Sequence, residues 1–416
     1  MDGSVYHNFD LSVEAAGEAY RARVIASPAG EGETLFPAPF AAGELAGFPP
    51  DALTPATARD LGGRLYAAVF SGAVRDLWQR SLQAAEAAGA GLRLRLRLDA
   101  GAHSRAPLLA DWPWECLYDA EVGRFLALSR GTPVVRYLEL PAAASPLAAA
   151  GPLRLLAVLA APAGYPPLDT AGEWAGIQAA LAPLAAAGRL TAERLAPATP
   201  AALQRRLRQP GPHILHFVGH AAFDPDTAEG VLVWEDEEGR GRPMRAARLA
   251  ALLHDARETL RLVVLNTCAT AQSSPADPFG GAAQALVRAG IPAAVAVQAP
   301  LADRAAITLA REFYAAIADD LPVDAALAEA RKALFVQEDD MAWGNILLFM
   351  RSPDGRLFAT QEAPAAEDRS AGEARGGAHI HIGGSYVGGD LDNRGGVFVG
   401  RDAASSTPRT SADNAL

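Results

Sequence analysis

Two short apolar runs, each ending in a polar and reactive residue, most constrain the fold of this chain. The first lies in HILHFVGHAAFD and ends at Gly219 and His220; the second lies in LRLVVLNTCATA and ends at Asn266, Thr267 and Cys268. Apolar runs of this length, bounded by turn residues, are typical of strands buried on both faces of a parallel sheet. Reactive groups gather at the carboxyl edge of such sheets. If the strands are neighbours, the thiol and the imidazole lie side by side, as a nucleophile beside its base.

The segment from Leu153 to Met350 alternates strand patterns with helix patterns, which predicts an α/β fold with right-handed crossovers. At 416 residues the chain is long enough for several domains. We expect four parts, at residues 1–88 (an N-terminal α+β module), 89–360 (an α/β domain with its core at 150–352), 361–376 (a flexible, polar linker) and 377–416 (a Gly-rich tail).

The N-terminal part carries two further local patterns. The stretch from Leu61 to Ala88 has helical spacing of its apolar residues. Arg93, Arg95 and Arg97 alternate strictly with leucines, which predicts a half-buried strand with a basic exposed face.

The tail repeats one short unit, SYVGGD and VFVGRD, between Ser385 and Asp402. Two Gly-punctuated strands cannot bury a core alone. One interpretation is a disordered tail or a strand pair added to the α/β domain. The other is a β motif that pairs through its exposed edges with an upstream sensor or with further copies of this chain.

Composition excludes several classes of partner and location. The formal charge of −11 argues against nucleic acid as the main partner. Arg, Glu, Pro or Gly interrupts every apolar run before it reaches membrane-spanning length, so we expect no membrane association. The start of the sequence shows no signal-peptide pattern, and two cysteines fit a reducing cytoplasm. Cys116 lies in the apolar stretch DWPWECLYD and is expected to be buried and unreactive.

A metal or phosphate-binding site has little support. His213, His216 and His220 would not converge on one ion, because side chains along an extended strand alternate between faces. The sequence also contains no glycine-rich phosphate loop. We therefore expect neither a metal nor a cofactor.

The motifs FVGHAAFD and LNTCATA, in this order and each after an apolar strand, resemble those of the CHAT proteases, in the caspase- and separase-like clan of cysteine peptidases. Two further stretches, PWECLYD with the following FLALSRGTPVVR, and AWGNILLFMRSPDGRLF, resemble the entry and the closing strand of such domains. The resemblance covers about residues 90 to 360. It implies a caspase-like α/β/α sandwich with a mostly parallel central sheet.

The resemblance also implies roles for individual residues. His220 would hold the thiol proton and Cys268 would attack the scissile carbonyl. The backbone N–H groups of Cys268 and Ala221 would bind the oxyanion. Relatives usually carry glycine where this chain has Ala221, and a positive φ would strain an alanine.

An acidic residue some thirty-odd positions after the cysteine holds a basic P1 side chain in separase-like members. Asp303 occupies that place here, so the resemblance implies cleavage after Arg or Lys. Asp303 could instead N-cap the helix that follows it. Asn266 stands where metacaspase-like relatives place an S1 aspartate, and its amide carries no charge.

These features favour a cysteine endopeptidase, and the resemblance implies that it cuts a partner protein as an effector in bacterial signalling or defence. The alternative is a catalytically silent, caspase-like adaptor whose tail mediates assembly.

Overall fold

A computed structural model describes residues 5–49, 52–98, 109–141, 144–149, 151–224, 229–267, 278–337 and 341–360. The described residues belong to one compact unit. Cys268, the linker at 361–376 and the tail at 377–416 lie outside the described residues.

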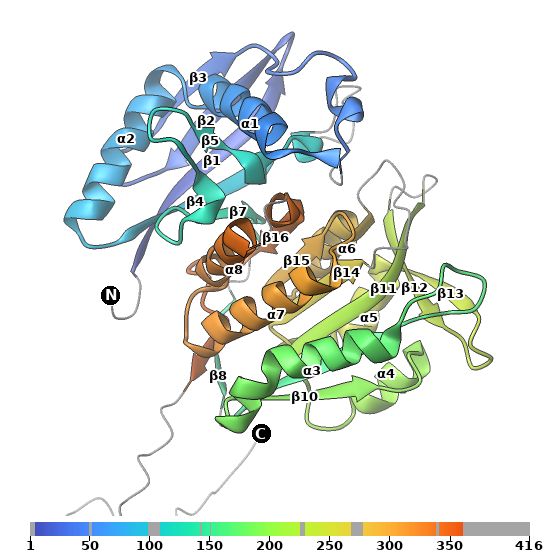
Figure 1. The fold of residues 1–416 in the computed structure, drawn as a ribbon. Helices are drawn as coiled ribbons and strands as arrows, with labels where there is room; N and C mark the ends of the chain where they lie inside the picture. The colour runs from blue at the N-terminus through green and yellow to red at the C-terminus, as the bar shows by residue number, and fades with distance from the viewer. Residues whose placement is uncertain are drawn as a thin grey trace, which may run out of the picture. The chain divides into compact units, whose positions relative to one another are not determined.

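A 13-stranded sheet runs through the whole unit (Figure 1). In spatial order its main path is β10 (Leu190–Leu195), β9 (Leu153–Leu159), β11 (Ile214–Asp224), β14 (Leu262–Thr267), β15 (Ala293–Val297), β16 (Ile346–Met350), β7 (Val134–Tyr137), β4 (Gly91–Leu98), β1 (Tyr6–Ala16), β2 (Ala19–Ala26) and β3 (Gly32–Phe36). Along this path only the pairs β15–β16, β1–β2 and β2–β3 are antiparallel. From β11 an antiparallel hairpin branches off, formed by β12 (Glu229–Glu235) and β13 (Gly241–Arg245).

Helices cover both faces of the sheet. One face carries α3 (Thr170–Ala186), α7 (Asp303–Ala318) and α8 (Val323–Gln337), and the other carries α4 (Pro200–Arg206), α5 (Ala246–Leu253) and α6 (Pro278–Arg288). The N-terminal strands are covered by α1 (Pro55–Val69) and α2 (Gly72–Ala87). These layers confirm the predicted α/β/α sandwich with a mostly parallel central sheet.

The central strands are apolar on both sides because each side faces a hydrophobic core. Along β11, Ile214 and Val218 belong to one core, whereas Leu215 and Phe217 belong to the other. This alternation follows from the two-residue period of a strand. It explains why these strands appear in the sequence as continuous apolar runs rather than alternating ones.

The N-terminal strands continue the same sheet. β1 pairs in parallel with β4 across the predicted boundary at residue 88, and one hydrophobic core contains side chains from β1, β4 and α8. The predicted helix over Leu61–Ala88 is two helices, because Phe70 and Ser71 interrupt it.

The prediction of a basic exposed face on β4 is wrong. Arg93 is 1% exposed and pairs with Asp324 of α8, while Arg95 pairs with Asp10 of β1. Arg97 also contacts Asp10. Buried ion pairs of Arg93 and Arg95 therefore link β4 to α8 and β1.

No helix within the described ranges is both long and apolar enough to cross a bilayer.

Candidate active site

The two strands that end in reactive residues are neighbours. β11 and β14 pair in parallel, with Val218 opposite Asn266 and Gly219 opposite Thr267. The parallel pairing of the two strands therefore ends at one edge of the sheet, as the sequence pattern predicted, although β11 itself continues to Asp224. His220 follows Gly219 in the chain, and Cys268, outside the described residues, follows Thr267.

His220 is buried at this edge and held by a loop. Its side chain is 3% exposed, and its Nε2 atom lies 3.0 Å from the carbonyl oxygen of Pro166. A carbonyl only accepts hydrogen bonds, so Nε2 carries the hydrogen and Nδ1 is left as the basic nitrogen. Burial lowers the pKa of His220, and the hydrogen bond to Pro166 opposes that shift. A lowered pKa favours the neutral, proton-accepting form of the imidazole.

An aromatic ring covers the same imidazole. The ring of Tyr165 stacks on His220 with 5.4 Å between ring centroids and 30° between planes. Tyr165 and Pro166 belong to the loop between β9 and α3, which crosses the edge of the sheet where β11 continues past β9.

Beyond the sheet edge, β11 pairs with the hairpin strand β12. Ala221 lies opposite Leu232 in this antiparallel ladder. Among the described residues other than glycine, only Asp320 has a positive φ. Ala221 therefore has ordinary extended geometry, and an alanine at this position carries no backbone strain.

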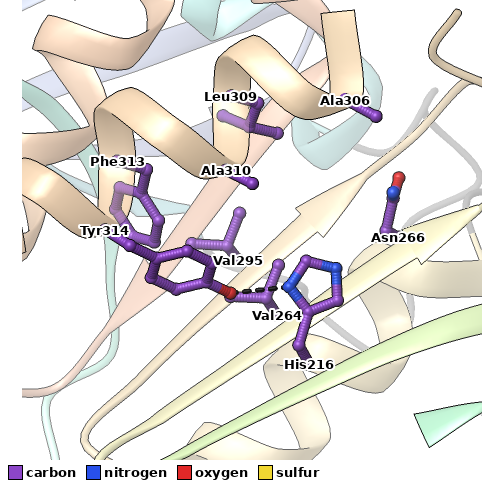
Figure 2. A pocket seen from close by; sticks show the side chains of 9 residues that line it. All are labelled: His216, Val264, Asn266, Val295, Ala306, Leu309, Ala310, Phe313 and Tyr314. Carbon is purple, nitrogen blue, oxygen red and sulfur yellow. Dashed lines mark hydrogen bonds between the residues drawn. The ribbon is translucent and has the colours of Figure 1, made fainter. Parts of the chain in front are cut away.

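Asn266 is buried beneath α7, next to a small cavity (Figure 2). Its side chain is 6% exposed, and its Oδ1 atom has no hydrogen-bond partner among the described residues. His216 lines the same cavity, and its Nδ1 atom lies 2.6 Å from the hydroxyl oxygen of Tyr314. The volume of this cavity that is open to the centre of a water molecule is only about 10 Å³. The cavity is at the lower limit for holding one water molecule.

The three histidines of β11 have three separate partners. His213 accepts a hydrogen bond from the backbone N–H of Arg154, whereas His216 meets Tyr314 and His220 meets Pro166. Burial lowers the pKa of His213 and of His216 to about 4. In the part of the chain that the structure describes, no group of three His, Cys, Asp or Glu side chains is placed to hold a metal ion.

Asp303 is the first residue of α7, and it is exposed. The N-cap residue of α7 is Ala302, and no side chain makes a capping hydrogen bond there. The alternative that Asp303 N-caps the helix is therefore wrong. Asp303 follows β15, which is parallel to β14, and therefore lies at the carboxyl end of these strands. Ala306, less than one turn further along α7, lines the same cavity as Asn266.

Cys116 is buried, as predicted. Its side chain is 1% exposed, and burial raises the pKa of its thiol to about 12. The thiolate is the reactive form of cysteine, so Cys116 is chemically inert at neutral pH.

Sequence reasoning missed two of the described groups that hold His220. A backbone carbonyl has no side-chain signature, and Tyr165 in PAGYPPLD resembles any loop aromatic. The nearest signal was the proline-rich composition of the segment that follows β9.

A mostly parallel sheet between two layers of helices, with a buried histidine beside the ends of its central strands, defines an α/β/α sandwich with a candidate site at its carboxyl edge. The sequence profile of the CHAT domain family matches residues 61–365, more than half of the sequence, so this chain belongs to the CHAT domain family. A comparison with curated proteins gave no match.

Two solved structures illustrate what the chain is similar to. One is the Arg-specific cysteine proteinase gingipain R, with a TM-score of 0.40 and 12% identity over 67% of this chain and 67% of that chain. The other is the Saccharomyces cerevisiae separase–securin complex, with a TM-score of 0.34 and 11% identity over 63% of this chain. The match covers 15% of the separase chain.

Proposed function

We propose that this chain is a cysteine endopeptidase in which His220 and Cys268 form the catalytic dyad. The observation that carries the proposal is the pairing of Gly219 with Thr267, because each of these residues immediately precedes a member of the dyad. Consecutive Cα atoms are about 3.8 Å apart, so neither reactive residue is far from this pair. The lowered pKa of His220 and the burial of Cys116 support the same assignment.

In the proposed reaction, Nδ1 of His220 takes the proton of the Cys268 thiol as the sulfur attacks the scissile carbonyl. Backbone N–H groups of Ala221 and Cys268 donate to the oxyanion. Collapse of this intermediate breaks the peptide bond, and His220 gives its proton to the leaving amine. Water then attacks the thioester while His220 accepts a proton from that water. The C–S bond breaks, the acid product leaves, and His220 returns the proton to the sulfur of Cys268.

Asp303 and Asn266 are the proposed substrate-binding residues at the S1 site. An exposed carboxylate at the edge where the dyad lies is suited to pair with a P1 guanidinium or ammonium group. Asn266 adds a buried amide oxygen that has no described partner of its own. We therefore propose cleavage after Arg or Lys in a protein substrate.

The biological role proposed with this activity is that of an effector in bacterial signalling or defence. It rests on the resemblance of the His and Cys motifs to CHAT proteases, and it requires a partner protein as substrate.

The test compares wild type, Cys268→Ala and Cys116→Ala on fluorogenic peptides that end in Arg, Lys or Asp. Wild type and Cys116→Ala should release the fluorophore after Arg and Lys, and Cys268→Ala should not. Equal turnover by wild type and Cys268→Ala, or a preference for Asp, would contradict the proposal. Absence of turnover by every protein would favour the adaptor alternative.

A further inference from the structure

Two hydrogen bonds join the β12–β13 hairpin to the loop that carries Tyr165 and Pro166. The backbone N–H of Ala161 donates to Oε1 of Glu235 at 3.0 Å. Two residues further on, the backbone N–H of Ala163 donates to the carbonyl oxygen of Gly239 at 2.8 Å. Both acceptors lie in the hairpin or its tip. The loop is therefore fixed to the hairpin by two hydrogen bonds before it reaches Tyr165.

A third contact joins Tyr165 itself to the hairpin. A Cβ atom added to Gly241 would lie 2.2 Å from Cε2 of Tyr165 and 2.9 Å from its Cδ2. These distances are far below van der Waals contact, so the ring rests directly on the glycine backbone. Any larger residue at position 241 must displace the ring.

The same ring stacks on His220, and the next residue supplies the carbonyl that accepts from Nε2. We propose that Tyr165 is a positioning residue for His220, and that the β12–β13 hairpin fixes the orientation of this imidazole through Gly241 and Tyr165. Only the expected effect on catalysis rests on the proposed function; the orientation of the His220 ring does not.

Two observations separate this role from ordinary packing. Tyr165 is 37% exposed, so it contributes less to the hydrophobic core than a buried ring does. The contacts also form an uninterrupted series from Gly241 through Tyr165 to His220. Displacing the ring would remove a group that, among the described residues, restricts rotation of the imidazole.

The experiment follows His220 directly, by NMR of the full chain with isotopically labelled histidine, and uses His220→Asn to assign its signals. Gly241→Ala displaces the ring, Tyr165→Ala removes it and Tyr165→Phe retains it. Arg242→Ala, at an exposed residue of the same hairpin, is the matched control. Peptide hydrolysis is measured in parallel.

Gly241→Ala and Tyr165→Ala should both shift the His220 ring signals, whereas Tyr165→Phe and Arg242→Ala should leave them in place. In the Tyr165→Ala background, adding Gly241→Ala should have no further effect. Where hydrolysis is measurable, kcat should fall roughly tenfold to a hundredfold with little change in KM, as expected when a catalytic group is misplaced.

Unchanged His220 signals in folded Gly241→Ala and Tyr165→Ala would overturn the inference, whatever the activity. An effect of Gly241→Ala that persists without the Tyr165 ring would overturn it too. Shifted signals in a protein without peptidase activity would support the positioning role and count only against the proposed function.

Discussion

The Nε2 atom of His220 lies 3.0 Å from the carbonyl oxygen of Pro166. This contact holds the ring through Nε2 and leaves Nδ1 as the basic nitrogen. A backbone carbonyl carries no full charge, so it orients the imidazole without stabilising the imidazolium as a carboxylate would.

The first prediction concerns the titration of His220. Burial disfavours the charged imidazolium and lowers its pKa from the ordinary value of 6.5, so His220 should be neutral at pH 7. NMR titration in a Cys268→Ala background, which removes coupling to the thiol, should give a pKa below 6.5. A value at or above 6.5 would show that a nearby group stabilises the cation instead.

The second prediction concerns Asp303 and substrate choice. Replacing Asp303 by Asn removes the charge while keeping the shape. A charge-assisted hydrogen bond contributes about 1.5–3 kcal/mol, so kcat/KM for Arg- and Lys-ended peptides should fall roughly tenfold to a hundredfold. The control variant Glu312→Gln, on the same helix, should leave kcat/KM for these peptides unchanged. Equal losses in both variants would remove Asp303 from the specificity site.

The third prediction uses two adjacent glycines of α1. A Cβ atom on Gly62 would lie 1.7 Å from the carbonyl oxygen of Cys116, whereas one on Gly63 would meet nothing closer than 3.9 Å. Gly62→Ala should lower the free energy of unfolding by about 2 kcal/mol or more, since backbone must move. Gly63→Ala should raise it by roughly 0.5–1 kcal/mol through helix propensity. Urea unfolding measures the free energy of unfolding of both variants. Equal changes in the two variants would contradict the packing of α1 against the backbone of Cys116.

The fourth prediction concerns acid stability. Burial lowers the pKa of His216 from 6.5 to about 4, so below pH 6.5 the unfolded chain binds a proton that the folded chain does not. The free energy of unfolding should be highest above pH 6.5 and should fall by about 3 kcal/mol for this residue as the pH drops to about 4. The His216→Gln variant has no titratable group at this position. Urea unfolding at both ends of this pH range should therefore show a smaller fall in its free energy of unfolding than in that of wild type. An unchanged slope would mean that His216 is protonated in the folded state.

Much of the fold could be predicted from the sequence. The runs in β11 and β14 are apolar on both faces, which occurs mainly in central parallel strands, and their adjacency is confirmed by the register. The face of β4 could not be predicted. An alternation of Arg and Leu has the same period whether the arginines meet water or buried carboxylates, and Asp10 and Asp324 are distant in sequence.

The candidate site could be predicted in part. His220, Asn266 and Asp303 lie at one edge of the sheet because parallel neighbouring strands end together. The contacts of His216 with Tyr314 and of His220 with Tyr165 depend on how α7 and the β9–α3 loop pack on the sheet. Such contacts between distant segments have no local pattern.

The most direct test of the central claim is to identify the alkylated thiol. The chain has two cysteines, and a peptidyl-arginine chloromethyl ketone alkylates a thiolate with loss of chloride. Mass spectrometry should find one adduct on Cys268 and none on Cys116, and His220→Ala should slow the labelling about a hundredfold. Modification of Cys116 with Cys268 intact, or equally fast labelling in His220→Ala, would contradict the dyad.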